Sequence, residues 1–594
     1  MAKINDFEIK DFLGGLVTNK SDFEIARNEF PDTLNMDFEE MGKAKRRRGI
    51  MQFGDVKSGK TFDESFLFTP QILGSVPIVY HLVFDRASSG TIFKIAGTYT
   101  TAAVAIGDTT INVDRVNTHF AAASAVININ GDEINYDGTS ATTFTHSADM
   151  SIDKAHPTRS LVQQIVSIGT GTDTQLGAYV SQLSNVLFIS GRAGSKTLAS
   201  DGSTISSLLS PGPAGLFATN FRDRIYVAGS GKTNAATTRN GGRTRVSFSA
   251  AGNATDWSSF ATDFFDVEDD RGEMITGLKE LADNLFIFKM NSMFSYDEVT
   301  LQQRLFDVGA YNHKVIQRID KLIYTFCPQG VFVTDGNTAK KISEPIEKFL
   351  KDFHPIFDTD LGRVVLNTYS GKYKQKYFLY LDLTLIDGTV KEDLCLVYDT
   401  IRKNWTIYDN FENFTHLGSL NGFHTGETIS STAGVFQSVE SLFAGDSSGK
   451  YWKLFDKRYL DNESAKRPKG GDIIANRLGD GVNGKPISTV LETPFYDLGS
   501  PIWKTIGYIT FLVEEGEFDV SYRLDRGNNA TDWFPLGNFS RTVKDSRVLA
   551  SGKNQGYRIS FKITGNTLAS ISKFNGFVVR DINTQDEKRK WQMK

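Results

Sequence analysis

The sequence predicts a mainly β protein with a β-propeller core, a small inserted β domain and a C-terminal β-sandwich. Its 53 glycines, 44 phenylalanines and 20 tyrosines, against 14 prolines, supply many tight turns and many aromatic strand residues. Short apolar runs ending in Gly, Asp or Asn turns also recur every few dozen residues, as at 186–189 and 225–228. Each propeller blade has two apolar faces that only neighbouring blades cover, so this recurrence favours a closed ring.

Changes of pattern divide the chain, which is too long for one hydrophobic core. Residues 1–53 show little periodicity and are interpreted as an extended N-terminal arm that packs on its neighbours. Residues 54–98 and 159–485 are assigned to the propeller, and residues 99–158 to the inserted β domain. A polar linker then precedes residues 486–594, whose alternating strands are enough for a β-sandwich.

Two local signals refine this organisation. Asn130-Gly131 lies in an alternating stretch of the insert and predicts a hairpin turn there. One helix is predicted after Ser343, with Pro345 in its first turn, because apolar residues follow at helical spacing: Ile346, Phe349, Leu350 and Phe353.

Composition excludes several classes of protein. With 23% charged residues and a net charge of −4, the chain is not a dedicated nucleic-acid binder, which would be basic overall. Cys327 and Cys395 have no ligand spacing and are expected to be buried small hydrophobes, not zinc ligands or a disulfide. We expect neither a signal peptide nor a membrane span, because no long apolar stretch occurs.

Two enzyme motifs, the P-loop and the nucleophile elbow, are matched in residue spacing but not in the structural elements that they need. Gly54, Gly59, Lys60 and Thr61 have the P-loop spacing, with 378–382 as a possible acidic strand, but no helix follows to hold phosphates. The similar stretch 229–233 lacks the first glycine, since Tyr226 stands there. Residues 445–449 have the spacing of a nucleophile elbow, but a strand follows them, so a hairpin turn is favoured.

Histidines and acidic residues give no catalytic or metal pattern. The eight histidines never pair at ligand spacing and are interpreted as isolated core or surface residues: His81, His119, His146, His156, His313, His354, His416 and His424. A propeller glycosidase would need two converging carboxylates, for which the candidates are Asp266, Glu268, Asp269, Asp270, Asp393 and Asp399. Charge runs are normally solvated. We therefore predict no catalytic, cofactor or metal site, and no enzyme.

A word-for-word repeat has a structural interpretation. Asn253-Ala254-Thr255-Asp256-Trp257 recurs at 529–533, each time after a turn that contains glycine. A hairpin motif with a packed tryptophan is favoured over a shared ligand site.

A basic run ends the predicted arm: Lys43, Lys45, Arg46, Arg47 and Arg48. As a solvated or salt-bridging arm it needs no ligand. As part of a channel lining it would meet DNA phosphates without reading their sequence. As an assembly contact it would instead bind a neighbouring subunit. The first interpretation is favoured.

About 40 residues at the opening of the chain form a distinctive pattern, at 12–19, 30–32, 34–38, Gly42 and 46–49. A Gly-Gly-Leu phrase precedes an Asn-rich segment and a basic turn ending in glycine. This pattern resembles the opening of tail hub or nozzle proteins of short-tailed bacteriophages. The insert at 99–158 is not part of the pattern.

The resemblance implies a structural virion protein of the tail, assembled in the host cytoplasm and needing no cofactor. It implies a sixfold ring of identical copies below the portal and adaptor, with DNA passing through the lumen and fibres or spikes attached outside. Such a ring needs head-to-tail interfaces on every copy. Two alternatives stay open: a glycan-binding receptor-recognition protein, and a propeller-type polysaccharide hydrolase.

Overall fold

A computed structural model describes the chain from residue 3 to residue 584, with gaps. The longer gaps are 71–78, 172–178, 230–242, 359–363, 385–389, 422–439, 456–486, 527–531, 548–554 and 566–572, and shorter ones interrupt other loops. Nearly every element is a β-strand, which confirms the predicted fold class. The helical elements among the described residues are η1 (His313–Val315), η2 (Glu344–Ile346) and α1 (Glu347–Lys351), of which the last two form the predicted helix.

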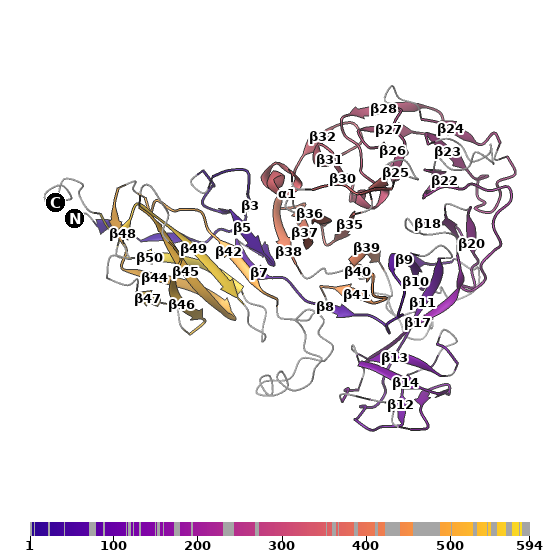
Figure 1. Cartoon of the computed structure of the whole chain (residues 1–594), viewed down its shortest axis with the longest axis horizontal. Coiled ribbons are helices and arrows are strands. Elements are labelled where there is room, and N and C mark those ends of the chain that lie inside the picture. Colours follow the sequence, from indigo (N-terminus) through magenta and orange to yellow (C-terminus); the bar gives the residue numbers. More distant parts are fainter. Residues whose placement is uncertain are drawn as a thin grey trace.

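Within the described residues, seven antiparallel sheets follow one another around a ring, which Figure 1 shows face on. Their strands, blade by blade, are β9 (Phe62–Phe68), β10 (Tyr80–Asp85), β11 (Thr91–Tyr99) and β17 (Leu161–Thr170); β18 (Tyr179–Leu183), β19 (Val186–Ser190) and β20 (Lys196–Leu198); β21 (Phe217–Phe221), β22 (Arg224–Ala228), β23 (Arg245–Phe248) and β24 (Phe264–Asp266); β25 (Ile275–Leu281), β26 (Asn284–Lys289), β27 (Ser292–Tyr296) and β28 (Leu301–Phe306); β29 (Gln317–Ile319), β30 (Leu322–Cys327), β31 (Gly330–Thr334) and β32 (Ala339–Lys341); β35 (Thr368–Tyr373), β36 (Lys376–Thr384), β37 (Val390–Asp399) and β38 (Asn404–Tyr408); and β39 (Phe414–Asn421), β40 (Glu440–Asp446) and β41 (Tyr451–Leu454) with β8 (Ile50–Gln52).

The ring closes through its first and last blades. The first strands of most neighbouring blades lie against one another, and β39 contacts both β35 and β9. The outer strand of the last blade is β8, which precedes the first blade in sequence and pairs with β41, with Met51 opposite Lys453. Backbone hydrogen bonds to the N-terminal segment therefore hold the ends of the propeller together.

Tight turns join the first two strands of successive blades. Their first residues include Ser184, Arg222, Ala282 and Asp320, all of which have positive φ. Two-residue turns with positive φ match the right-handed twist of paired strands. None of these four residues is glycine, so the turns carry no strong signal in the sequence.

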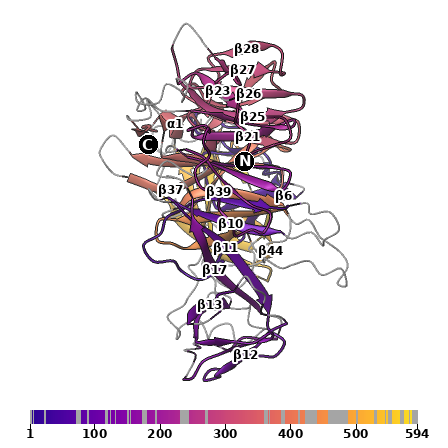
Figure 2. The same cartoon turned by 90° about the vertical axis from the view of Figure 1, so that its right-hand side faces the viewer.

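The inserted domain lies between β11 and β17 of the first blade. Its strands are β12 (Thr110–Asn112), β13 (Ala125–Ile129), β14 (Asp132–Tyr136), β15 (Gly138–Thr139) and β16 (Thr143–Thr145). β13 pairs with β17 and extends the blade outward, and a separate apolar core lies beneath these strands. Asn130 and Gly131 lie outside the described residues, but β13 and β14 pair across them. Figure 2 shows the domain projecting beyond the propeller.

The C-terminal sandwich is built from both ends of the chain. One sheet contains β2 (Phe7–Ile9), β6 (Met36–Glu40), β7 (Lys43–Arg46), β44 (Tyr508–Glu515), β47 (Asp545–Arg547) and β50 (Lys573–Arg580). The facing sheet contains β5 (Asp32–Leu34), β42 (Thr489–Glu492), β45 (Glu517–Asp525), β46 (Phe534–Ser540) and β49 (Arg558–Gly565). Four short strands form a further sheet: β1 (Lys3–Ile4), β43 (Lys504–Thr505), β48 (Gln555–Gly556) and β51 (Ile582–Thr584). Two separate pairs of short strands complete the described elements: β3 (Gly15–Leu16) with β4 (Glu29–Phe30), and β33 (Phe357–Asp358) with β34 (Val364–Val365).

The expectation of a separate arm over residues 1–53 is wrong for the described part of that segment. Phe12, Phe30 and Phe38 are buried in the same core as Phe511 and Phe577. Removing these aromatic side chains from water favours their packing between the two sheets over an exposed arm.

β5 joins the sandwich to the propeller. It pairs in parallel with β38 of the sixth blade, with Leu34 opposite Ile407, and antiparallel with β42 of the sandwich. One nine-stranded sheet therefore runs from the sixth blade into the sandwich (Figure 1). The two domains are therefore joined by backbone hydrogen bonds through β5.

A buried polar network secures this junction. The Asn35 amide donates to Oδ1 of Asp409 at 2.6 Å and to the carbonyl of Ser488 at 2.7 Å. Nε of Arg47 donates to Oδ1 of Asn35 at 2.8 Å, and the same oxygen accepts from the Asp409 backbone amide at 3.1 Å. Asn35 has a φ of 55°, in the left-handed region that asparagine tolerates better than most residues. Its side chain therefore connects the N-terminal segment at Arg47, the end of the sixth blade at Asp409 and the start of the sandwich at Ser488.

Asn35→Ala should therefore destabilise the protein by about 3 kcal/mol, because it leaves buried donors without an acceptor. Urea denaturation followed by intrinsic fluorescence measures the loss. Asn538→Ala is the control, since Asn538 lies exposed on the sandwich, and a surface change should cost less than about 0.5 kcal/mol. Equal stability of the two variants would contradict the role of Asn35.

Closure by β8 makes a second prediction. Ile50 is 1% exposed in the core between the sixth and seventh blades, and Ile50→Ala should cost about 3 kcal/mol through lost burial and the cavity left behind. Ile106, which is 67% exposed, provides the control Ile106→Ala. Scanning calorimetry should show a lower unfolding temperature for the first variant alone. An unchanged temperature would mean that β8 does not hold the ring.

Candidate functional site

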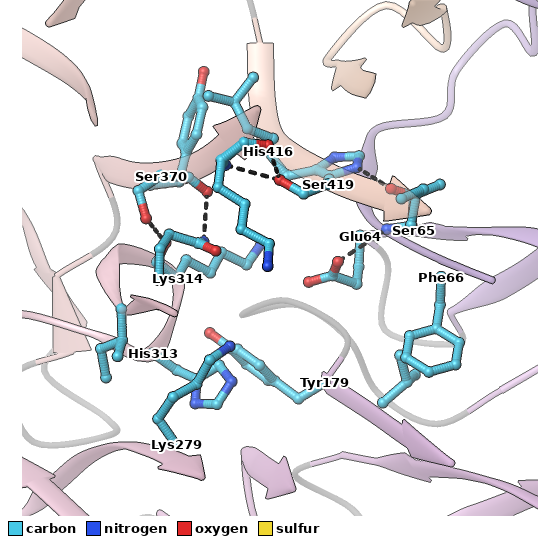
Figure 3. Close-up of a pocket in the computed structure, with 18 of the residues that line it drawn as sticks. Glu64, Ser65, Phe66, Tyr179, Lys279, His313, Lys314, Ser370, His416 and Ser419 are labelled. Carbon is cyan, nitrogen blue, oxygen red and sulfur yellow. Dashed lines mark hydrogen bonds between the residues drawn. The ribbon is translucent and has the colours of Figure 1, made fainter. Parts of the chain in front are cut away.

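The centre of the propeller is hollow, and polar side chains line it (Figure 3). A cavity of about 410 Å³ is bordered by residues of β9, β18, β25, η1, β29, β35 and β39. A second cavity of about 670 Å³ shares Lys279, His313 and Lys372 with the first. We call the two together the central channel. Propeller rings bring the first strand of every blade to their axis, so residues far apart in sequence meet there.

Two neighbouring acidic residues of β9 differ in their environment. Asp63 is buried and forms an ion pair with Lys314, whose Nζ lies 2.8 Å from Oδ2. Glu64 lines the first cavity, and its Oε1 accepts from the Ser65 amide at 3.0 Å. Burial raises the pKa of Glu64 to about 7, although Lys314 opposes the shift. The Glu64 carboxyl is therefore partly protonated at neutral pH.

Lys279 of β25 and Lys372 of β35 also line both cavities. Burial, together with repulsion from Lys372, lowers the pKa of Lys279 to about 8. Within the described part of the chain, neither ammonium has an ion-pair or hydrogen-bond partner. Glu280 and Glu64 act on Lys279 only from a longer distance, so the protein compensates its charge only in part.

Two histidines of the channel are held neutral. Nδ1 of His313 accepts from the Leu278 amide at 3.2 Å, and its ring stacks on Phe217 with centroids 5.6 Å apart. Burial lowers the pKa of His313 to about 3 and that of His416 to about 4. Nδ1 of His416 lies 3.1 Å from the Phe62 carbonyl and Nε2 lies 3.3 Å from Oγ of Ser65. The carbonyl only accepts, so Nδ1 carries the proton and Nε2 accepts from the serine.

The basic run at 43–48 is distributed over three environments. Nζ of Lys43 pairs with Glu514 at 2.8 Å. Arg46 and Arg47 are each 1% exposed, so the favoured interpretation of a solvated run is wrong for these two, and the alternative of contact with DNA phosphates does not fit them either, because both side chains lie inside the protein. Lys45 and Arg48 line a small cavity beside Tyr373 and Lys374. Only these two and Lys43 remain candidates for DNA or assembly contacts.

The motifs that resemble nucleotide and serine hydrolase sites are turns. Lys60 donates to Asp85 at 2.9 Å and Thr91 at 3.1 Å, and strand β9 follows it where a P-loop needs a helix. Residues 445–449 span the end of β40 and a hairpin turn to β41, as predicted, with Asp446 accepting from the Ser448 and Lys450 amides. Residues 230–233 and the side chain of Asp382 lie outside the described residues.

The candidate carboxylates of a hydrolase lie apart. Asp266, on the outer strand β24, forms two hydrogen bonds with Arg245 at 2.8 and 2.9 Å. Asp399, at the end of β37, pairs with Arg402 at 2.9 Å and caps the following turn. Residues 268–270 and the Asp393 side chain lie outside the described residues. Neither described candidate lines the central channel.

Other predicted residues have structural roles. Cys327 and Cys395 are free and buried, as predicted. Nε1 of the buried Trp257 donates to the Ala254 carbonyl at 3.0 Å, consistent with a packed tryptophan, but residues 529–531 of the second copy lie outside the described residues. His81 and His156 are buried with the partners Tyr451 and Asp132. His146 is half-buried and His354 is exposed, while His119 and His424 are outside the described residues.

Within the described ranges, no group of three His, Cys, Asp or Glu side chains is arranged to hold a metal ion. No helix there is long and apolar enough to cross a membrane.

No family model matches the chain, and no curated protein matches it. Solved structures resemble it weakly. An extracellular domain from B. thetaiotaomicron is 9% identical with a TM-score of 0.24, and the match covers 75% of this chain and 52% of that one, so this chain spans about half its length. BamB from Moraxella catarrhalis is 10% identical with a TM-score of 0.25, covering 59% and 100%. An exo-beta-1,3-galactanase from Phanerochaete chrysosporium is 10% identical with a TM-score of 0.21, covering 68% and 95%. The propeller assignment rests on strand pairing, not on these superpositions.

Sequence reasoning missed the channel residues. They come from elements spread along most of the propeller, namely β9, β18, β21, β25, η1, β29, β35 and β39, and His313 and His416 were expected only as isolated residues. The available signal was polar side chains that interrupt otherwise apolar strands, such as Asp63-Glu64-Ser65 in β9 and Lys279-Glu280 in β25.

Titration of Glu64 makes the stability depend on pH. Its pKa is raised from 4.5 to about 7, so the folded protein binds more protons than the unfolded chain between those values. The stability that this group contributes is complete below pH 4.5 and is lost as the pH rises through 7. Glu64→Gln removes the cost of burying the ionised carboxyl and should therefore raise the free energy of unfolding above that of the wild type. The gain should be on the order of 1–2 kcal/mol across this range, since channel water screens part of the effect.

Thermal unfolding measured from pH 4.5 to 8 tests this expectation. Glu8→Gln is the matched control, since the Glu8 side chain is 45% exposed on the sandwich. Its profile should run parallel to the wild type. A Glu64→Gln profile that also runs parallel would show that the carboxyl is not buried in its neutral form.

Proposed function

We propose that the chain is a structural protein of a bacteriophage tail, a hub or nozzle subunit. It associates into a sixfold ring that continues the DNA channel below the portal and adaptor and anchors fibres or spikes. Its place is the tail of the virion, and it works by shape and not by catalysis.

The observation that carries this proposal is the position of the residues that resemble the hub family. Phe12, Phe30 and Phe38 are in the core of the sandwich, Asn35 is at the junction, and Arg47 completes the junction network. These residues join two β domains into one body, which is what a load-transmitting subunit of a ring requires. The resemblance therefore concerns residues that set architecture.

Charge supports the same proposal. The net charge of −4 disfavours tight binding of a passing duplex, whose affinity comes mainly from neutralised phosphates. A conduit must let DNA slide, so basic side chains should be few along its lumen. The burial of Arg46 and Arg47 removes two cations from the surface.

The arrangement of carboxylates favours the structural role over the hydrolase. Inverting and retaining glycosidases place two carboxyl groups about 5 to 9.5 Å apart across the substrate. In the first cavity of the channel, Glu64 is the one carboxylate among its lining residues, all of which are described. The second cavity adds Glu280, which is paired with Arg318, and Asp320, which accepts from Gln375. Asp63, its neighbour, is committed to Lys314.

The location of the chain in particles tests the proposal. Mass spectrometry of gradient-purified phage particles should detect the chain at a fixed low copy number, close to six per virion. Gold-labelled antibodies against the purified chain should mark the tail just below the head.

Absence of the chain from purified particles would contradict a virion role. A trimer that binds host glycans would favour the receptor-recognition alternative. Release of reducing sugars from host polysaccharide, abolished by a carboxylate substitution, would favour the hydrolase.

A further inference from the structure

We propose that the central channel binds a compact divalent oxyanion, a phosphate or sulfate group, between Lys279 and Lys372. This inference rests on propeller residues alone, so its test does not depend on whether the protein is part of a phage tail.

The charges around the channel are unevenly matched. Lys314 is neutralised by Asp63 at 2.8 Å, and Arg318, at the edge of the second cavity, by Glu280 at 2.9 Å. Lys279 and Lys372 have no such partner among the described residues, although both line both cavities. Two ammonium groups that repel each other in a partly dehydrated space are stabilised by an anion placed between them.

Neutral donors lie beside the two lysines. Burial raises the pKa of Tyr179, so its hydroxyl keeps its proton, and that hydroxyl has no hydrogen-bond partner within the described residues. Nδ1 of His313 accepts from the Leu278 amide, which leaves the proton on Nε2. Figure 3 shows Tyr179, Lys279 and His313 on the same side of the cavity. A tetrahedral oxyanion has enough acceptor oxygens for both cations and these donors.

The other polar groups of the channel are already occupied. Oγ of Ser370 donates to the Lys314 carbonyl at 2.7 Å, and Oγ of Ser419 accepts from the Lys372 amide at 2.7 Å. Ser65 is taken by His416. The Glu64 carboxyl is the exception among these groups, since it lines the first cavity and acts on Lys279 from a distance. Burial raises its pKa to about 7, and an anion bound beside it would further favour its protonated form, which donates a hydrogen bond. The remaining free capacity is donor capacity, which selects an acceptor-rich ligand. A volume of about 410 Å³ admits a small ion or the end of a larger ester.

Isothermal titration of the full chain with inorganic phosphate and with sulfate tests the proposal. Sodium chloride holds the ionic strength constant, and acetate serves as the monovalent comparison. Both divalent ions should bind with one site per chain and acetate should not. Lys279→Gln and Lys372→Gln should each raise Kd at least about tenfold, the effect of losing one charge-assisted contact.

Two further variants separate charge from folding. Lys279→Arg keeps the cation and should retain binding, and Lys340→Gln, on an exposed position of β32, should leave Kd unchanged. Failure of the wild type to bind either divalent ion would overturn the proposal. So would equal affinity in Lys279→Gln and the wild type, or loss of binding in Lys279→Arg together with Lys279→Gln.

Discussion

Backbone pairing by the N-terminal segment is the interaction on which the rest of the structure depends. Before the first blade begins, the chain has already supplied strands to both sheets of the sandwich, the β5 bridge to the sixth blade and the β8 strand of the seventh. A propeller that is not closed leaves the apolar faces of its first and last blades exposed. Because one short segment makes both the closure and the domain junction, the two are coupled mechanically.

Closure also creates the chemistry of the channel. Residues of β9, β25, η1, β35 and β39 meet only when the ring is complete. The ring walls remove part of the water around these side chains, and this loss of hydration is the main cause that holds Glu64 partly neutral and His313 and His416 uncharged. Lys279 is destabilised by the same loss of water, which Glu280 and Glu64 offset only in part.

The sequence predicted what depends on local pattern. Recurrent strands, the hairpin at 445–449, the helix after Ser343 and the buried cysteines all follow from neighbouring residues, and the structure confirms them. The N-terminal segment was misinterpreted because Leu34 pairs with Ile407, and Met51 with Lys453, across hundreds of residues. Arg46 and Arg47 were expected in solvent because charge runs normally are. The buried Arg47 is held by Asn35 and Asp409, which no spacing rule connects to it.

Hydrogen exchange of the full chain tests the central claim most directly, namely that the N-terminal strands are integral to the propeller and the junction. Amides of β5 and β8 should exchange as slowly as those of their partners β38 and β41, since all four would open only when the ring opens. Rapid exchange in β5 and β8 beside protected blades would contradict the account. It would show a ring that closes without the segment.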